Sequence, residues 1–148
     1  MEFDIQMRVK RLDKGLPVPC YANPGDAGLD LYSTVDVRIE PLHRVMIPTG
    51  LAIALPQGYA GFVQPRSGLA LKKGLSIVNT PGLVDSGYRG ELKVIAINTD
   101  TDEPIDIARG ERVAQLVVQR VLAVDLVEVD ELDETERGEG GFGSTGLR

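Results

Sequence analysis

Hydrophobic and polar positions alternate along several parts of the chain. The alternation runs from Phe3 to Val9 and returns from Val35 to Ile39. Successive side chains of a strand point to opposite faces, so a period of two predicts half-buried β-strands in both places. Further β-rich runs predict strands at residues 45–48, 50–55, 59–64, 75–78, 92–98, 113–119 and 121–129.

Glycine and proline separate these runs. The 148 residues include 17 glycines and 9 prolines. Many short strands at regular spacing predict an all-β sandwich, jelly roll or barrel, here with one short helix at residues 67–73. We find neither an internal repeat nor a linker, so residues 1–136 are expected to form one domain. A chain of this length can bury about 68 to 70% of its unfolded surface.

The negative charge of the chain is concentrated near its C-terminal end. The net charge is −6, and residues 125–136 carry seven acidic residues and no basic one. Outside this run, 16 basic residues face 15 acidic ones. Without a basic surplus we expect no extended nucleic acid as a partner, whereas a pocket for one small phosphate compound is compatible with this balance. The acidic run itself is expected to be a solvated surface.

Cysteine and histidine occur once each, as Cys20 and His43. This excludes an internal disulfide and any zinc, haem or iron–sulfur site built from these residues, and it indicates a reducing compartment. The longest aliphatic run, residues 51–55, is too short for a signal-peptide core or a membrane span. We therefore expect a cytoplasmic protein with no membrane partner, in which Cys20 is structural and His43 lies at the surface.

The segment from Gly82 to Gly90 places a carboxylate and an aromatic ring on a glycine-hinged turn between strand-like runs. Glycine permits positive φ and close approach of the backbone to a ligand. Asp85 could act as a base and Tyr88 could provide a stacking face. The same pattern is also typical of a hairpin with a solvated aspartate.

Three other segments carry chemistry suited to a phosphate ligand. Residues 24–31 place two carboxylates among turn residues, and a carboxylate beside phosphate is what an Mg²⁺ site needs. Residues 65–70 offer the guanidinium of Arg66, the hydroxyl of Ser67 and backbone N–H groups at a helix start. Gln115 could donate to phosphate. Each feature also has a purely structural interpretation. Residues 24–31 could simply form a turn, residues 65–70 could simply begin a helix, and Gln115 could be a strand residue whose hydrogen bonds are already satisfied.

Residues 137–148 contain five glycines and almost nothing apolar. Such a segment cannot offset its ordering entropy by core burial, so a frayed tail is one reading. The other is an arm that orders over a ligand. Arg137 would then bind phosphate, Phe142 would stack on a ring, and Ser144 would donate its hydroxyl.

Taken in order, these segments resemble the homotrimeric deoxyuridine triphosphatase (dUTPase) family of bacterial type. The resemblance runs from Met7 to Gly146 and includes five motifs in order: PGDAGLDLYS at 24–33, PRSGLA at 65–70, NTPGLVDSGYRGELKV at 79–94, RGERVAQLVV at 109–118 and RGEGGFGSTG at 137–146. Any one motif is weak. Their joint occurrence at these separations is specific.

The resemblance implies a jelly-roll-like β-sandwich of the β-clip type, assembled as a threefold homotrimer with active sites shared between subunits. It implies Mg²⁺-dependent hydrolysis of dUTP to dUMP and pyrophosphate, which limits uracil in DNA and supplies dUMP for dTMP synthesis. Water, deprotonated by Asp85 as general base, attacks the α-phosphorus. Mg²⁺ bridges the phosphates and reaches Asp30 through water, while the phosphate oxygens are held by Arg66, Ser67, Gly68 and Gln115.

The resemblance also assigns the nucleoside contacts. Asn79 and the turn present backbone and amide groups to the uracil edge, and Tyr88 lies under the deoxyribose where a ribose 2′-hydroxyl would collide. In the arm, Phe142 stacks on uracil and Arg137 clamps phosphate. Besides Arg66, Ser67, Gly68 and Gln115, the substrate contacts that the resemblance implies are Asn79, Gly82, Val84, Tyr88, Lys93, Arg137, Phe142, Gly143 and Ser144.

Two alternatives share this fold. A dCTP deaminase would show a signature like IDPGF…TLELxN with a catalytic glutamate, but Ile95 stands where that glutamate would lie, and an aliphatic residue cannot shuttle protons. A non-catalytic nucleotide-binding module should have lost the base, a phosphate ligand or the arm. This sequence retains all three, which favours the diphosphatase.

Overall fold

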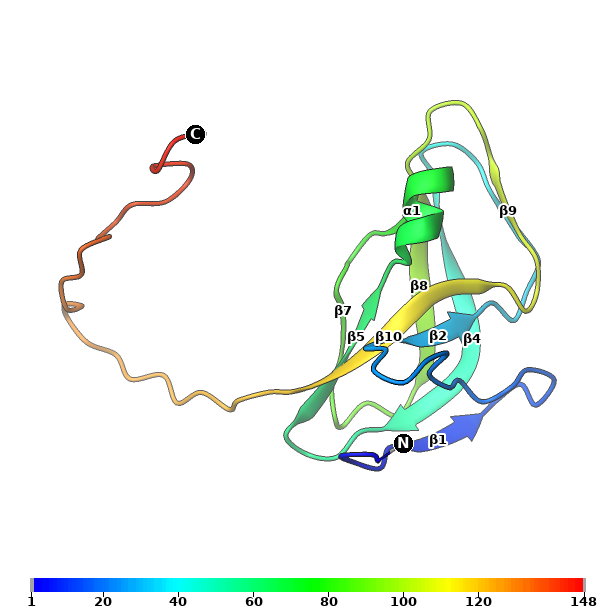
Figure 1. Cartoon of the computed structure of the whole chain (residues 1–148), viewed down its shortest axis with the longest axis horizontal. Coiled ribbons are helices and arrows are strands. Elements are labelled where there is room, and N and C mark those ends of the chain that lie inside the picture. Colours follow the sequence, from blue (N-terminus) through cyan, green and yellow to red (C-terminus); the bar gives the residue numbers. More distant parts are fainter. Residues whose placement is uncertain (1, 148) are drawn as a thin grey trace.

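Ten strands and one helix lie within residues 2–147, the part of the chain that the structure, a computed structural model, describes (Figure 1). Met1, the first residue of the expected domain, and Arg148, the last residue of the expected arm, lie outside the described residues. The strands form two four-stranded sheets and a small two-stranded ribbon, and a long C-terminal segment extends away from them.

Every strand pairing in the described residues is antiparallel. The first sheet contains, in spatial order, β1 (Arg8–Arg11), β4 (Arg44–Ala54), β8 (Glu91–Asn98) and β6 (Leu75–Ile77). The second contains β2 (Leu29–Tyr32), β10 (Arg112–Arg120), β5 (Tyr59–Gln64) and β7 (Gly82–Val84). The ribbon pairs β3 (Val37–Ile39) with β9 (Ile105–Ile107), and α1 (Ser67–Lys73) connects β5 to β6.

The inward faces of the two sheets form one hydrophobic core. Along β8, the buried residues Leu92, Val94 and Ala96 alternate with more exposed ones, as the period of two requires. Leu31 and Leu116 of the second sheet belong to the same buried cluster. The predicted all-β, jelly-roll-like sandwich with one short helix is confirmed.

The predicted bounds of β5 and α1 agree with the structure residue for residue. Residues 45–48 and 50–55 were predicted as separate strands, but they form the single strand β4. Gly50 has a φ of +71°, and the pairing of β4 with β8 shifts register between Pro48 and Ala52. The glycine therefore marks a bulge that bends the strand without ending it.

Other strand predictions were wrong or incomplete. The alternation that begins at Phe3 produces strand only from Arg8, because the partner residues of β4 end at Ala54, opposite Arg8. The strand predicted at 121–129 is absent. Its apolar side chains are exposed, with Leu122 at 85% and Leu126 at 89%, because no strand within residues 2–147 pairs with them.

The sequence pattern missed three strands, β2, β7 and β9. Each has only three or four residues and is flanked by glycine, proline or aspartate. These turn-forming residues obscure the alternation of apolar and polar positions that identifies a strand. Within residues 2–147, α1 does not have the length and apolar character that crossing a membrane requires.

Candidate active site

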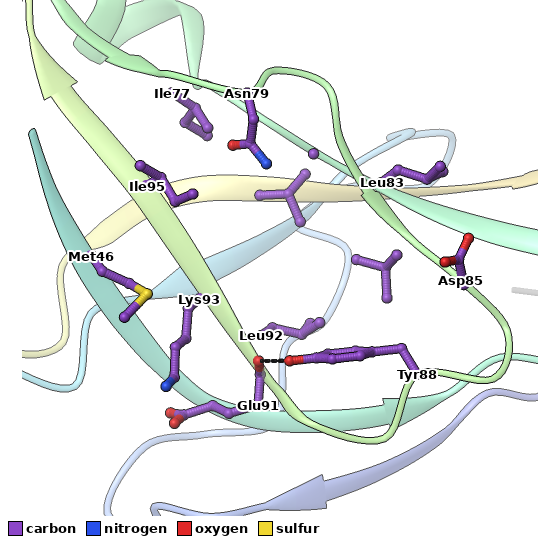
Figure 2. Close-up of a pocket in the computed structure, with 13 residues that line it drawn as sticks. Met46, Ile77, Asn79, Leu83, Asp85, Tyr88, Glu91, Leu92, Lys93 and Ile95 are labelled. Carbon is purple, nitrogen blue, oxygen red and sulfur yellow. Dashed lines mark hydrogen bonds between the residues drawn. The ribbon is translucent and has the colours of Figure 1, made fainter.

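A pocket of about 280 Å³ opens between β7 and β8, at the turn that joins them; we call it the turn pocket (Figure 2). It brings together six residues expected at the nucleoside and the base position: Asn79, Gly82, Val84, Asp85, Tyr88 and Lys93. The remaining wall is mainly apolar, from Met46, Val63, Ile77, Leu83, Leu92 and Ile95. A mostly apolar hollow with a few convergent polar groups suits a flat heterocyclic ligand.

Local hydrogen bonds fix the shape of the turn. β7 pairs with β5, so that Val84 lies opposite Gly61 and is buried. The chain then reverses through a turn closed by the Tyr88 N–H, which donates to the Asp85 carbonyl at 3.1 Å. Arg89 reinforces it by donating from Nη1 to the Ser86 carbonyl at 2.6 Å. The Asp85 carboxylate is thereby presented at the open rim, where a water molecule can reach it.

A second pocket, of about 620 Å³, lies between β2, β10 and the start of α1; we call it the basic pocket. Strand register explains its composition, since Gln115 of β10 lies opposite Asp30 on one side and opposite Gln64 on the other. α1 follows β5 directly and brings its first residues to the same place. The pocket thus collects the phosphate residues expected from the sequence: Asp30, Arg66, Ser67, Gly68 and Gln115.

Ion pairs and a hydrogen bond organise the basic pocket. Arg66 Nε lies 3.1 Å from one oxygen of Asp30, and Arg112 Nη1 lies 3.6 Å from the other. Gln115 Nε2 donates to the Pro65 carbonyl at 2.9 Å. Arg112 was not singled out from the sequence, although it lies within the fourth motif. Lys72 and Lys73, in the last turn of α1, also line the pocket and were likewise missed.

The charge of the basic pocket favours a polyanion. Four cationic side chains line it against two carboxylates, those of Asp26 and Asp30. A low-dielectric wall beside a surplus of positive charge attracts phosphate groups. Arg66 is half-buried, and its guanidinium can form two parallel hydrogen bonds to phosphate oxygens.

The side chains of the basic pocket suit a metal ion that is bound mainly by the phosphates of a ligand. No group of three or more His, Cys, Asp or Glu residues within the described part of the chain could hold a metal ion. Asp30 has an arginine near each carboxylate oxygen, which compensates its charge. Mg²⁺ commonly retains water molecules and binds through one or two carboxylates together with substrate phosphates. A water-mediated contact from Asp30 fits this donor set.

A salt-bridged cluster holds the far ends of β2 and β10 together. The Arg109 guanidinium forms a bidentate ion pair with Asp13 and donates to the Thr34 carbonyl at 2.8 Å. Backbone bonds between Ser33 and Gly110 and between Ser33 and Glu111 close the same junction. The Arg109 hydrogen bonds, aided by the Gly15 N–H, lower the pKa of Asp13 to about 2. The cluster braces the two strands that carry Asp30 and Gln115.

Residues 137–147 of the expected arm line neither pocket. Arg137 Nε donates to the Gly140 carbonyl at 2.8 Å, within the arm itself. Phe142 is fully exposed. Gly143 and Ser144 are exposed as well, and no arm residue within 137–147 lines the turn pocket or the basic pocket. Figure 1 shows the segment after β10 running away from the sandwich.

Comparison with known proteins places these features in a family context. A family model described as dUTPase matches residues 14–146. The chain is similar to proteins named deoxyuridine 5′-triphosphate nucleotidohydrolase. That of Rhodococcus erythropolis is 61% identical over 146 residues, covering 99% of this chain and 89% of the relative. That of Thermobifida fusca is 56% identical over 142 residues, covering 96% and 79%.

Solved structures give the same result. A mutant dUTPase of Staphylococcus bacteriophage 80alpha with dUpNHpp superposes with a TM-score of 0.90 at 31% identity, covering 96% of this chain and 99% of that one. A mutant dUTPase from phage phi11 of S. aureus, described as revealing the coordination of a structural Mg(II) ion, has a TM-score of 0.81 at 26% identity. It covers 88% of this chain and 100% of its own.

Proposed function

The chain belongs to the dUTPase family, and from this we propose that it hydrolyses dUTP to dUMP and pyrophosphate. The observation that carries the proposal is the turn pocket, where Asp85 and Tyr88 meet the uracil-edge residues Asn79 and Gly82. Such an enzyme limits uracil incorporation into DNA and supplies dUMP for dTMP synthesis. It would act in the cytoplasm, where the exposed thiol of Cys20 stays reduced.

Asp85 is the proposed general base. Its carboxylate lies at the rim of the turn pocket and can accept a proton from a water molecule as that water attacks the α-phosphorus. General base catalysis of this kind contributes about 10²- to 10⁴-fold in rate. Asn79 and the backbone around Gly82 and Val84 would hold the uracil edge, and Lys93, which also lines the pocket, would add a further contact. Tyr88 would support the sugar.

The basic pocket is the proposed triphosphate site. Arg66, Ser67 and Gly68 lie where α1 begins and would hold phosphate oxygens, and Gln115 would donate its amide from β10. Mg²⁺, held by the phosphates and through water by Asp30, would neutralise charge on the leaving pyrophosphate. The residues of this chain contribute by positioning and by fixed charge rather than by covalent chemistry.

We propose a homotrimer in which each active site draws on more than one copy. The turn pocket and the basic pocket of one chain have no lining residue in common. In addition, the segment 121–132 exposes a run of large apolar side chains that this chain leaves uncovered: Val121, Leu122, Val124, Leu126, Val127, Val129 and Leu132. Exposed apolar stretches of this kind are typical of association surfaces. A neighbouring copy would cover them.

The arm would complete the site by closing over bound nucleotide. Phe142 would stack on uracil, Arg137 would clamp phosphate, and Gly143 and Ser144 would add backbone and hydroxyl donors. Closure would exclude bulk water from the reacting phosphate. The hydrogen bonds of residues 137–147, such as that from Arg137 to Gly140, lie within the arm or reach Thr135, which is compatible with such a movement.

Product analysis tests the proposal. The purified chain is incubated with Mg²⁺ and, in separate reactions, with dUTP, dCTP, dTTP or UTP. Release of dUMP and pyrophosphate from dUTP, with little turnover of the others, is the expected result. Deamination of dCTP would instead indicate the deaminase branch, against which the aliphatic Ile95 in the wall of the turn pocket already argues. No turnover of any nucleotide would indicate a binding module.

A further inference from the structure

Glu91 is the first residue of β8, and its side chain reaches back to the bulge in β4. Glu91 Oε2 accepts a hydrogen bond from the Gly50 N–H at 2.9 Å. Gly50 lies where the ladder between β4 and β8 shifts register, so a side chain replaces a backbone carbonyl as the acceptor. Next to it, the Thr49 hydroxyl donates to the Leu92 carbonyl at 2.6 Å in a buried contact. The start of β8 is thus fixed to β4 at two adjacent points.

The backbone of Glu91 holds the ring of Tyr88. The Tyr88 hydroxyl donates to the Glu91 carbonyl at 2.8 Å, and Figure 2 shows this bond between two residues that line the turn pocket. The ring also lies close against Gly90. A Cβ atom at Gly90 would be 2.5 Å from the hydroxyl oxygen and 2.7 Å from Cζ, closer than real Cβ contacts. The ring is therefore bounded by Gly90 and tethered at its far end by Glu91.

Together these contacts make one connected support. The Gly50 N–H fixes the Glu91 side chain, the side chain fixes the first residue of β8, and the carbonyl of that residue fixes the Tyr88 hydroxyl. We propose that Glu91 is a positioning residue that determines how strictly this protein prefers a deoxyribonucleotide to a ribonucleotide. The inference rests on the proposed function, in which Tyr88 lies beneath the sugar.

Discrimination against UTP depends on how freely the Tyr88 ring can move. A tyrosine tethered at its hydroxyl cannot swing aside, so the added 2′-hydroxyl of UTP would collide with it. When the Glu91 side chain no longer fixes the start of β8, the acceptor carbonyl can shift, and the tyrosine can rotate about its side-chain bonds and make room. Loss of the support should therefore favour UTP relative to dUTP, rather than lower the turnover of both by the same factor.

The test compares Glu91→Ala with Glu91→Gln, using kcat/KM for dUTP and for UTP with Mg²⁺. Glutamine keeps an oxygen that can accept from the Gly50 N–H, whereas alanine does not. We expect the dUTP-to-UTP ratio to fall about 5- to 30-fold in Glu91→Ala, as for loss of one ordered contact, and to stay near the wild-type value in Glu91→Gln. An unchanged ratio in Glu91→Ala would overturn the inference.

Glu91→Gln also controls for charge, since Lys93 lies two residues further along β8. If both Glu91 variants lost discrimination equally, the acceptor role would be contradicted. Tyr88→Phe provides a second test that does not depend on the folding of the Glu91 variants, because it removes the hydroxyl and keeps the ring. We expect it to lower the ratio by a similar factor, and a wild-type ratio would overturn the inference.

The inference and the proposed function can fail separately. If the wild-type chain does not hydrolyse dUTP, both are overturned. If the wild-type chain hydrolyses dUTP selectively and the alanine and phenylalanine variants remain equally selective, only the role of Glu91 is overturned.

Discussion

Asp85 and Arg66 of the same chain line two pockets that have no residue in common. One is the proposed base and the other a proposed phosphate ligand, and both must act on one triphosphate. The arrangement is compatible with this chemistry if the turn pocket of one copy faces the basic pocket of another. Such a site would form only when the copies assemble. A functional site could then combine two variant chains, one that lacks Asp85 and one that lacks Arg66.

Mixed trimers test this arrangement. Asp85→Asn and Arg66→Gln are each expected to be nearly inactive alone. When equal amounts are unfolded and refolded together, about a quarter of the sites should combine an intact Asp85 with an intact Arg66 from another copy. We therefore expect the mixture to recover about a quarter of wild-type pyrophosphate release.

A matched mixture serves as the control. Asp85→Asn and Tyr88→Ala both alter the turn pocket of their own chain, so mixing them cannot restore that pocket. This mixture should stay at the level of its two components. Failure of the Asp85 and Arg66 pair to recover activity, although mixed trimers have formed, would contradict a shared site.

Asp85 itself can be tested by a change that keeps its shape. Asp85→Asn removes the ability to take a proton while preserving size and polarity, so turnover of dUTP should fall by about 10²-fold or more. Binding of dUpNHpp, measured by calorimetry, should change little. Asp102→Asn, in the exposed loop between β8 and β9, is the control and should behave as wild type. Near-normal turnover in Asp85→Asn would exclude Asp85 as the base.

The arm is expected to serve catalysis without supporting the fold. The structure records its hydrogen bonds within the arm or to Thr135, such as that from the Gly138 N–H. A chain ending at Glu136 should therefore keep the wild-type melting temperature and lose most of its turnover. Leu147→Ser, an arm change outside the proposed contacts, should remain active. Normal hydrolysis by the shortened chain would show that the arm is dispensable.

Much of the fold, and the residues that gather in the two candidate pockets, could be predicted because the relevant signals are local. Strand β5 lies directly between Gly58 and Pro65, and helix α1 is followed by Gly74, so nearby turn residues marked limits that match the structure. The site residues lie in short linear motifs, so their identities could be read in order. Strand β2 was missed because Asp30 and Gly28 give it the appearance of a turn.

What could not be predicted depends on partners in space. The run at 121–129 has real apolar character, but no strand in the described part of the chain pairs with it, so its apolar pattern predicted the wrong element. The division of the site between two pockets follows from strand register and helix placement. Glu91 holds Tyr88 through its backbone carbonyl and is itself held through its side chain by the Gly50 N–H, 41 positions away in the sequence, so no local pattern could have identified this support.

The Asp13–Arg109 ion pair should make the stability of the fold depend on pH in the acid range. The Arg109 guanidinium, together with the Gly15 N–H, lowers the pKa of Asp13 from its ordinary 3.8 to about 2. Because the folded-state pKa is below the unfolded one, the stabilisation is present above pH 3.8 and is lost as pH falls toward 2. Asp13→Asn should therefore unfold at a lower temperature than wild type at neutral pH, with the difference shrinking across this window.

Thermal unfolding followed by circular dichroism from pH 7 to pH 2 measures the effect. Arg109→Gln removes the partner and leaves the Asp13 carboxylate, so the pKa of Asp13 should return toward its ordinary value. The drop in stability between pH 4 and pH 2 should then be smaller in both variants than in wild type. If wild type and Asp13→Asn lose stability in parallel over this range, the Asp13–Arg109 ion pair does not couple the stability of the fold to pH.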